Sequence, residues 1–240
     1  MTTVIHVVNQ FFAGLGGEDK AGLPVAVTEG AVGAARGLQL QLGDKAEIAC
    51  TITYGDNYFH EHNQEAMKAI LEAVRSRKPD ILVAGPAFNS GRYGLSCIEI
   101  GNAVATALNI PCVAAMHDEN PAVGTYRDYA NANLYCLPTT ETAAGMTDAL
   151  KALAKFVSRL ISAERIGPAQ QEGYLTRGIR RLEKTDRPGV ERAIDMLLKK
   201  INGQPFVTEV PMEAWDQVPP APPLSRLKER NIAVDRPRLS

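Results

Sequence analysis

The chain has 240 residues, 45% of them hydrophobic, which is enough to bury one substantial core. Its 26 basic and 27 acidic side chains give a net charge of −1, and this balance argues against nucleic acid or an anionic membrane as the main partner. No run approaches the roughly 18 apolar residues of a membrane span, and the N-terminus lacks the basic stretch of an export signal. The cysteines form no CxxC pair, so we expect a reduced, cytoplasmic protein without a structural zinc site: Cys50, Cys97, Cys112 and Cys136.

Short apolar runs alternate with amphipathic segments through the first 165 residues. We expect five strands, over 3–8, 46–53, 81–84, 111–116 and 134–137. The helical spacing of apolar residues predicts helices over 31–42, 61–77, 94–108 and 140–162, the last with Thr139 or Thr140 as its N-cap. This order predicts a doubly wound, flavodoxin-like α/β domain over 1–165, with a parallel five-stranded sheet and helices on both faces.

The remainder, residues 166–240, has a different character and is predicted to be a C-terminal extension. It begins with a polar, glycine-containing loop and continues with an amphipathic helix over 189–201 that Asn202-Gly203 ends. Five prolines over 211–223 indicate an extended segment, and 231–234 forms a weak strand-like piece.

Polar and aromatic side chains follow each of the first four predicted strands. In a parallel sheet, ligands bind outside the carboxyl ends of the strands, so these side chains should meet at one edge. We therefore predict a binding site for a small molecule there. Its candidate residues are Asn9, Gln10, Asp56, Asn57, Asn89, Arg92, Tyr93, Glu119 and Asn120.

The loop after the third strand, 85–94, is the most informative of these segments. Its glycines permit tight turns, and the amides of the helix that follows favour a carboxylate. Arg92 could clamp that carboxylate. It could equally pair with Asp56 or Glu119 and tie the loops together, and both roles can coexist.

Two residues are candidates for catalysis. Cys97 lies in the first turn of the predicted helix, where the helix N-terminus can activate a thiol, although a small buried core residue is the favoured interpretation. His117 follows a strand and could act as a general acid or base, or be a satisfied loop histidine. We predict no metal site, because the rings of His60 and His62 would diverge at a helix start and no third ligand has a recognisable spacing.

A glycine run, Gly14-Leu15-Gly16-Gly17, follows the first strand. It lacks both the GxGxxG spacing of a dinucleotide fingerprint and the Lys-Ser/Thr of a P-loop, so it does not predict a nucleotide site.

Several long motifs resemble one known family, the selenoprotein subunit of component B in glycine, sarcosine and betaine reductases. The resemblance extends from about residue 3 to about residue 230. The motifs are VNQFFAGLGGE at 8–18, GDNYF at 55–59, AGPAFNSGRYG at 84–94, ENP at 119–121, EGYLTRGIR at 172–180 and RAIDMLLKK at 192–200.

This resemblance implies a substrate-side role in a complex. In the family, a partner subunit carries a pyruvoyl group that forms a Schiff base with an amine substrate, and a selenol on a separate protein takes part in the reductive cleavage of the C–N bond. The present chain would then carry no cofactor, help to hold a small amino acid or betaine, and act with a pyruvoyl-bearing subunit and a selenol or dithiol redox subunit. We expect an oligomer that is inactive as an isolated chain.

The sequence also departs from the family. Its members are roughly twice as long, and their second half contains a selenocysteine. Residues 231–234 of this chain resemble the first strand of that second half. Either the redox half is encoded separately or this is a truncated product. Tyr54 stands where many relatives carry Cys-Gly, and the substrate stays open. The alternatives are a non-catalytic small-carboxylate-binding or assembly protein, and a standalone enzyme with Cys97 as nucleophile.

Overall fold

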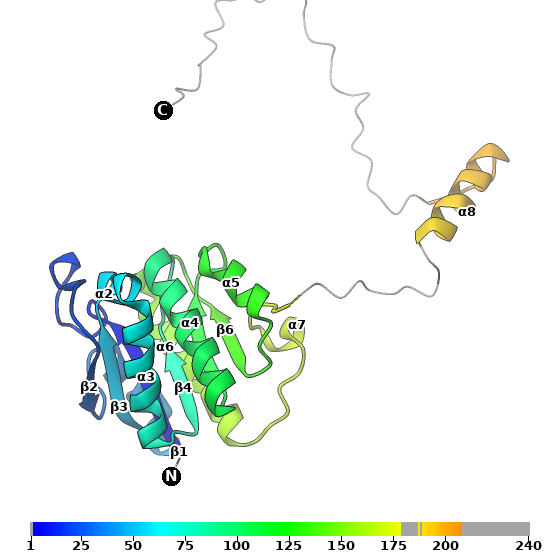
Figure 1. Ribbon diagram of the computed structural model, residues 1–240. Helices are drawn as coiled ribbons and strands as arrows, with labels where there is room; N and C mark the ends of the chain where they lie inside the picture. The colour runs from blue at the N-terminus through cyan, green and yellow to red at the C-terminus, as the bar shows by residue number, and fades with distance from the viewer. Residues whose placement is uncertain (1, 179–186, 188, 208–240) are drawn as a thin grey trace, which may run out of the picture. The chain divides into compact units, whose positions relative to one another are not determined.

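The computed structural model describes residues 2–178, 187 and 189–207. The chain divides into two units, 1–180 and 181–240, which are described separately. The first unit contains a six-stranded sheet (Figure 1). Its strands are β1 Thr2–Asn9, β2 Ala26–Glu29, β3 Ala46–Tyr54, β4 Ile81–Ala84, β5 Cys112–Met116 and β6 Leu134–Pro138. Its helices are α1 Ala34–Leu42, α2 Asp56–Glu61, α3 Asn63–Arg77, α4 Gly91–Leu108, α5 Ala122–Tyr129, α6 Met146–Ile161 and α7 Ala169–Glu172.

The strand order is β2-β3-β1-β4-β5-β6, and the prediction of five strands was wrong by one. The extra strand, β2, pairs antiparallel with β3 at the edge of the sheet, while the other five strands are parallel. All four residues of β2 are exposed, so its sequence carries no apolar alternation that could reveal it. The parallel strands alone run in the order second, first, third, fourth, fifth; the flavodoxin-like classification stays a prediction.

Helices cover both faces of the sheet, as Figure 1 shows. Alternate residues of each strand point to opposite faces. In β1, Ile5 and Val7 therefore pack into a core beneath α2, α3, α4 and α5, whereas Val4 packs into a second core beneath α1 and α6. Both cores sit below the carboxyl ends of the parallel strands, here called the carboxyl edge, which is the upper edge in Figure 1.

The connection from β6 to α6 differs from the predicted one. Residues 139–145 form a loop that ends in a 3₁₀ turn, Ala143–Gly145, so the helix begins at Met146 rather than at Thr140. Thr140 is not an N-cap: its hydroxyl donates to the carbonyl of Thr142 at 3.2 Å, within the loop. This late start leaves residues 141–143 at the carboxyl edge.

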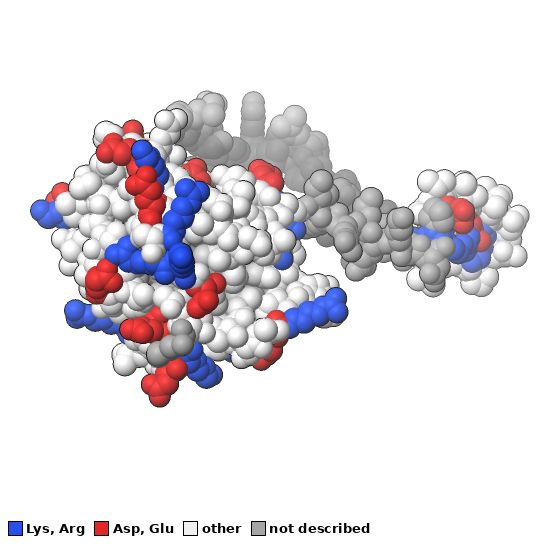
Figure 2. Space-filling model, turned by 60° about the horizontal axis from the view of Figure 1, so that its bottom comes forward, with Lys and Arg blue, Asp and Glu red and all other residues white. Residues whose placement is uncertain are grey.

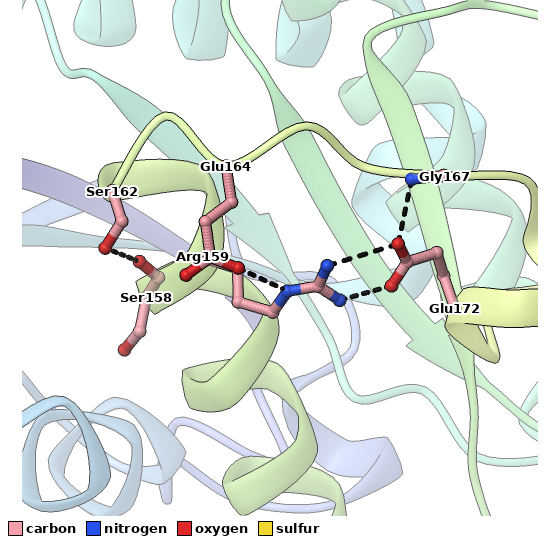
Figure 3. Close-up of polar contacts among 6 residues, drawn as sticks. All are labelled: Ser158, Arg159, Ser162, Glu164, Gly167 and Glu172. Atoms are coloured by element: carbon pink, nitrogen blue, oxygen red, sulfur yellow. Dashed lines mark hydrogen bonds and ion pairs between the residues drawn. The ribbon is translucent and has the colours of Figure 1, made fainter.

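Residues 166–178, here called the strap, lie on the α/β unit. The strap covers the free edge of β6: the Leu175 amide donates to the Cys136 carbonyl at 2.7 Å, and Arg177 Nη1 donates to the Leu134 carbonyl at 2.7 Å. An unpaired strand edge is prone to pair with other chains, so this cover protects the sheet. Figure 3 shows the second attachment, where Arg159 of α6 pairs with Glu172, whose Oε1 also accepts a bond from the Gly167 amide at 2.8 Å.

In the second unit, α8 spans Gly189–Ile201, the bounds predicted from its amphipathic pattern. The predicted proline-rich segment over 211–223 and the strand-like piece over 231–234 lie outside the described residues. No helix in the described part of the chain combines the length and apolar character needed to cross a membrane. On the face that Figure 2 shows, basic and acidic side chains are interspersed, in keeping with the balanced composition.

Candidate functional site

An open cleft of about 500 Å³ lies at the carboxyl edge, between the ends of β1 and β4. From β1 the chain continues to β3 on one side of the sheet, and from β4 it continues to β5 on the other side. Open α/β sheets bind ligands where the connections of two neighbouring strands run in opposite directions. The cleft is lined by Asn9, Gln10, Phe11, Phe12, Gly17, Glu18, Asp56, Ala87, Phe88, Asn89, Ser90, Arg92, Glu141, Thr142 and Ala143.

Three polar residues form one wall of the cleft. Asn9, the last residue of β1, donates from Nδ2 to Asp56 Oδ2 at 2.8 Å, and its Oδ1 accepts the Phe12 amide at 3.0 Å. Gln10 Oε1 accepts the backbone amide of Asp56 at 3.0 Å, at the start of α2. These bonds fix the orientation of the Asp56 carboxylate.

Asp56 is a desolvated carboxylate. It is only 7% exposed, and burial raises its pKa, an effect opposed by its bonds to Asn9 and Gln10. No salt bridge to it is found among the described residues, and its Oδ1 is buried without a hydrogen-bond partner there. A carboxylate held this way stabilises a nearby positive charge more strongly than an exposed carboxylate does.

Arg92, in the first turn of α4, adds a positive charge to the cleft lining. Its Nη1 donates to Asn57 Oδ1, and its Nη2 pairs with Glu18 Oε1 at 2.9 Å. His60 Nε2 donates to the backbone carbonyl of Arg92 at 3.2 Å. Of the two alternatives that the sequence left open, loop-tying therefore occurs, but with Glu18 and Asn57 rather than with Asp56 or Glu119.

The β4–α4 loop is positioned from behind by two buried side chains. His6 Nε2 donates to the Gly85 carbonyl at 2.6 Å, and burial lowers the pKa of His6 to about 4, so the ring is neutral near neutral pH. Asn120 Nδ2 donates to the Phe88 carbonyl at 2.9 Å and to the Ser90 carbonyl at 3.1 Å. A Cβ on Gly94 would lie 2.6 Å from Asn120 Oδ1, so only glycine lets Asn120 approach this closely.

Aromatic rings complete the cleft. The rings of Phe11 and Phe12 pack edge-on with centroids 5.2 Å apart, and Phe12 and Phe88 lie 5.7 Å apart. Phe11 is 58% exposed. Because aromatic faces attract cations, this apolar lining suits an alkylated ammonium group.

The structure thus brings together five of the predicted substrate-binding residues as cleft lining: Asn9, Gln10, Asp56, Asn89 and Arg92. Asn57 contacts the cleft through Arg92. Asn120 acts behind the loop, Tyr93 is fully buried in the core, and Glu119 is exposed outside the lining residues.

The two predicted catalytic residues also lie outside the lining. Cys97 is fully buried in the core, and burial raises the pKa of its thiol well above the ordinary value, with the charge of Asp56 acting in the same direction. Its surroundings favour the core role. His117 accepts the Glu119 amide through Nδ1 at 3.3 Å and places Nε2 3.4 Å from Asp118 Oδ1, which is the pattern of a satisfied loop histidine.

Sequence reasoning missed Glu18, Glu141 and Thr142, which also line the cleft. Glu141 and Thr142 follow β6. The expectation that ligands bind beyond the carboxyl ends of the strands would have included them, but the helix was predicted to start at Thr140. Glu18 lies nine residues beyond the end of β1, and no local pattern places it.

The cleft therefore combines one arginine with carboxylates and aromatic rings, an arrangement that suits a small molecule carrying both a negative and a positive charge. In the portion of the chain that the structure describes, no three His, Cys, Asp or Glu side chains gather as a metal-binding group.

Comparison with known proteins gives consistent results. Residues 1–236 match the family model described as glycine/sarcosine/betaine reductase selenoprotein B. The chain is 43% identical over 231 residues to the sarcosine reductase complex component B subunit beta of Peptoclostridium acidaminophilum, covering 96% of this chain and 52% of that protein. It is 42% identical to the glycine reductase complex component B subunit gamma of Carboxydothermus hydrogenoformans, with the same coverage. It is 39% identical over 236 residues to the betaine reductase complex component B subunit beta of Peptoclostridium acidaminophilum, covering 98% of this chain and 53% of that protein.

The chain spans about half the length of the curated relatives it matches. No solved structure matches it. Because the family model covers nearly all of its residues, this chain belongs to the glycine/sarcosine/betaine reductase selenoprotein B family.

Proposed function

We propose that this chain is a subunit of a glycine/sarcosine/betaine reductase-type complex, in which it holds a small amino acid or betaine for reductive C–N cleavage. Membership of the family and relatives that are components of sarcosine, glycine and betaine reductase complexes support this role. The observation that carries it is the placement of Arg92 and the desolvated Asp56 in one cleft at the carboxyl edge.

These two charges match a zwitterion. The substrate carboxylate would lie against the Arg92 guanidinium, because arginine binds carboxylates through parallel N–H bonds. The positively charged nitrogen would then lie toward Asp56 and the phenyl rings of Phe11 and Phe12. Asn9 and Gln10 hold Asp56 in place, so they would orient the carboxylate that faces the substrate nitrogen.

Partners would supply the redox chemistry. All four cysteines are free and buried, and burial raises the pKa of Cys97, which disfavours its use as a nucleophile. We therefore assign the pyruvoyl group and the selenol or dithiol reductant to other subunits, and no cofactor to this chain. Four unpaired cysteines support a cytoplasmic location, and the order of the parallel strands supports the flavodoxin-like classification.

The test is binding of glycine, sarcosine and betaine, measured by titration calorimetry on the wild-type chain and on Arg92→Ala. Loss of a charge-assisted pair with the carboxylate should weaken binding by about 10- to 100-fold. Arg75→Ala is the matched control, because Arg75 is an exposed arginine in the last turn of α3, outside the cleft lining. Equal affinities of wild type and Arg92→Ala, with both folded, would remove Arg92 from the site and refute the proposal.

A further inference from the structure

The glycine run after β1 has a structural explanation in the cleft. Gly14 and Gly16 adopt positive φ angles of 77° and 144°, which side chains other than glycine rarely allow. A Cβ on Gly16 would also lie 2.5 Å from Lys20 Cγ. These turns bring the chain back over the cleft, where Gly17 and Glu18 join its lining.

Residues 16–20, here called the flap, are flanked by backbone hydrogen bonds on both sides. On the N-terminal side, the Leu15 amide donates to the Gln10 carbonyl at 2.9 Å. On the C-terminal side, the carbonyls of Ala21 and Leu23 accept the Tyr58 and Gly55 amides at 3.0 and 2.8 Å. The bond from Arg92 to Glu18 joins the flap to α4. The other hydrogen bonds between the flap and described residues stay within residues 16–23.

The contact between Glu18 and Arg92 uses part of the guanidinium group that the substrate carboxylate is proposed to use. Nη2 of Arg92 is 2.9 Å from Glu18 Oε1, while Nη1 is occupied by Asn57. A bound carboxylate would need the same face of the guanidinium. Asn57 can remain in place during the exchange, because it holds the other nitrogen.

The pair is also easily broken. The side chains of Arg92 and Glu18 are 51% and 69% exposed, and solvent-exposed ion pairs contribute little stability. Exchange of one carboxylate for another on the same arginine therefore costs only the small free energy of that pair.

We propose that Glu18 is an intramolecular competitor for the substrate carboxylate: it pairs with Arg92 and must leave when the substrate binds. This inference rests on the proposed function, since it takes Arg92 as the carboxylate site. Glu18 is then a determinant of affinity, and its displacement frees the flap from α4.

The test is a double-mutant cycle of Glu18→Gln and Arg92→Ala, measured by calorimetry with glycine, sarcosine and betaine. Glu18→Gln should tighten binding by about 1.5- to 5-fold, the range expected when an exposed pair no longer competes. In the Arg92→Ala background the same substitution should leave affinity unchanged, because the competition acts through that arginine.

Asp19→Asn is the matched control. It removes the same charge from the neighbouring residue, and Asp19 contacts Gly17 and Lys20 rather than Arg92. Equal tightening by Asp19→Asn, or tightening that persists with Arg92→Ala, would reduce the effect to general electrostatics and overturn the inference. Weaker binding by Glu18→Gln would also overturn it.

The two proposals fail differently. If Arg92→Ala weakens binding and Glu18→Gln has no effect, only the competition by Glu18 is refuted. If Arg92→Ala has no effect, the proposed carboxylate site is refuted, and the competition falls with it.

Discussion

Burial decides the roles of the candidate residues. Asp56 and Cys97 are both desolvated, but Asp56 lines the cleft and Cys97 lies in the core beneath it. Desolvation makes a carboxylate at a binding surface attractive to a cation, whereas it keeps a thiol protonated and inert. Arg92 has the opposite character, because its exposure lets it exchange one carboxylate partner for another.

Cys97→Ala should therefore lower stability and leave binding unchanged. Removal of one buried sulfur atom should reduce the free energy of unfolding by about 1–2 kcal/mol, measured by chemical denaturation. Calorimetry with the same three ligands should give affinities within about 2-fold of wild type, the usual scatter of a remote change. Lost binding in a folded Cys97→Ala chain would show that the thiol takes part in the site after all.

Among the elements, the strap combines apolar packing of Tyr174 and Leu175 with a partly buried ion pair between Arg159 and Glu172. The Arg159 pair and the Gly167 amide lower the pKa of Glu172 to about 2 (Figure 3). Because the folded pKa lies below the unfolded value of 4.5, this stabilisation is present above pH 4.5 and is lost as the pH falls toward 2.

Glu172→Gln should loosen the strap without unfolding the sheet. Amide hydrogen exchange of Leu175, which donates to the β6 edge, should become faster near neutral pH, since the strap loses its ion pair. Glu164→Gln is the control, because Glu164 pairs with the same Arg159 but is more exposed, 53% against 14%. Equal protection of Leu175 in wild type and Glu172→Gln would show that the ion pair does not hold the strap.

The elements also show what the sequence can predict. Strands with a buried apolar pattern, such as β1 and β3, and long amphipathic helices such as α3 and α8 carry their own signal. The edge strand β2 and the eight-residue helix α5 do not, since one is wholly exposed and the other is short. Residues directly after a strand could be assigned to the cleft, but Glu18 meets Arg92 across 74 positions, a pairing that only the folded chain defines.

At the scale of the whole molecule, the site proposed at the carboxyl edge lies on a unit whose charges are balanced in sign. Its net charge is −1, and the face in Figure 2 mixes both signs of charge. A basic groove lies along α6, lined by Lys151, Lys155 and Arg159 together with Lys45. This groove offers an anionic ligand an alternative to the site proposed at the carboxyl edge.

The most direct test is an NMR titration of the isotope-labelled chain with glycine, sarcosine and betaine, following backbone amide shifts. We expect the shifts to concentrate in the segments around the cleft, residues 9–12, 16–18, 56–57, 87–92 and 141–143. Shifts confined to the groove of Lys45, Lys151 and Lys155, or spread without focus over the surface, would contradict the placement of the site between β1 and β4.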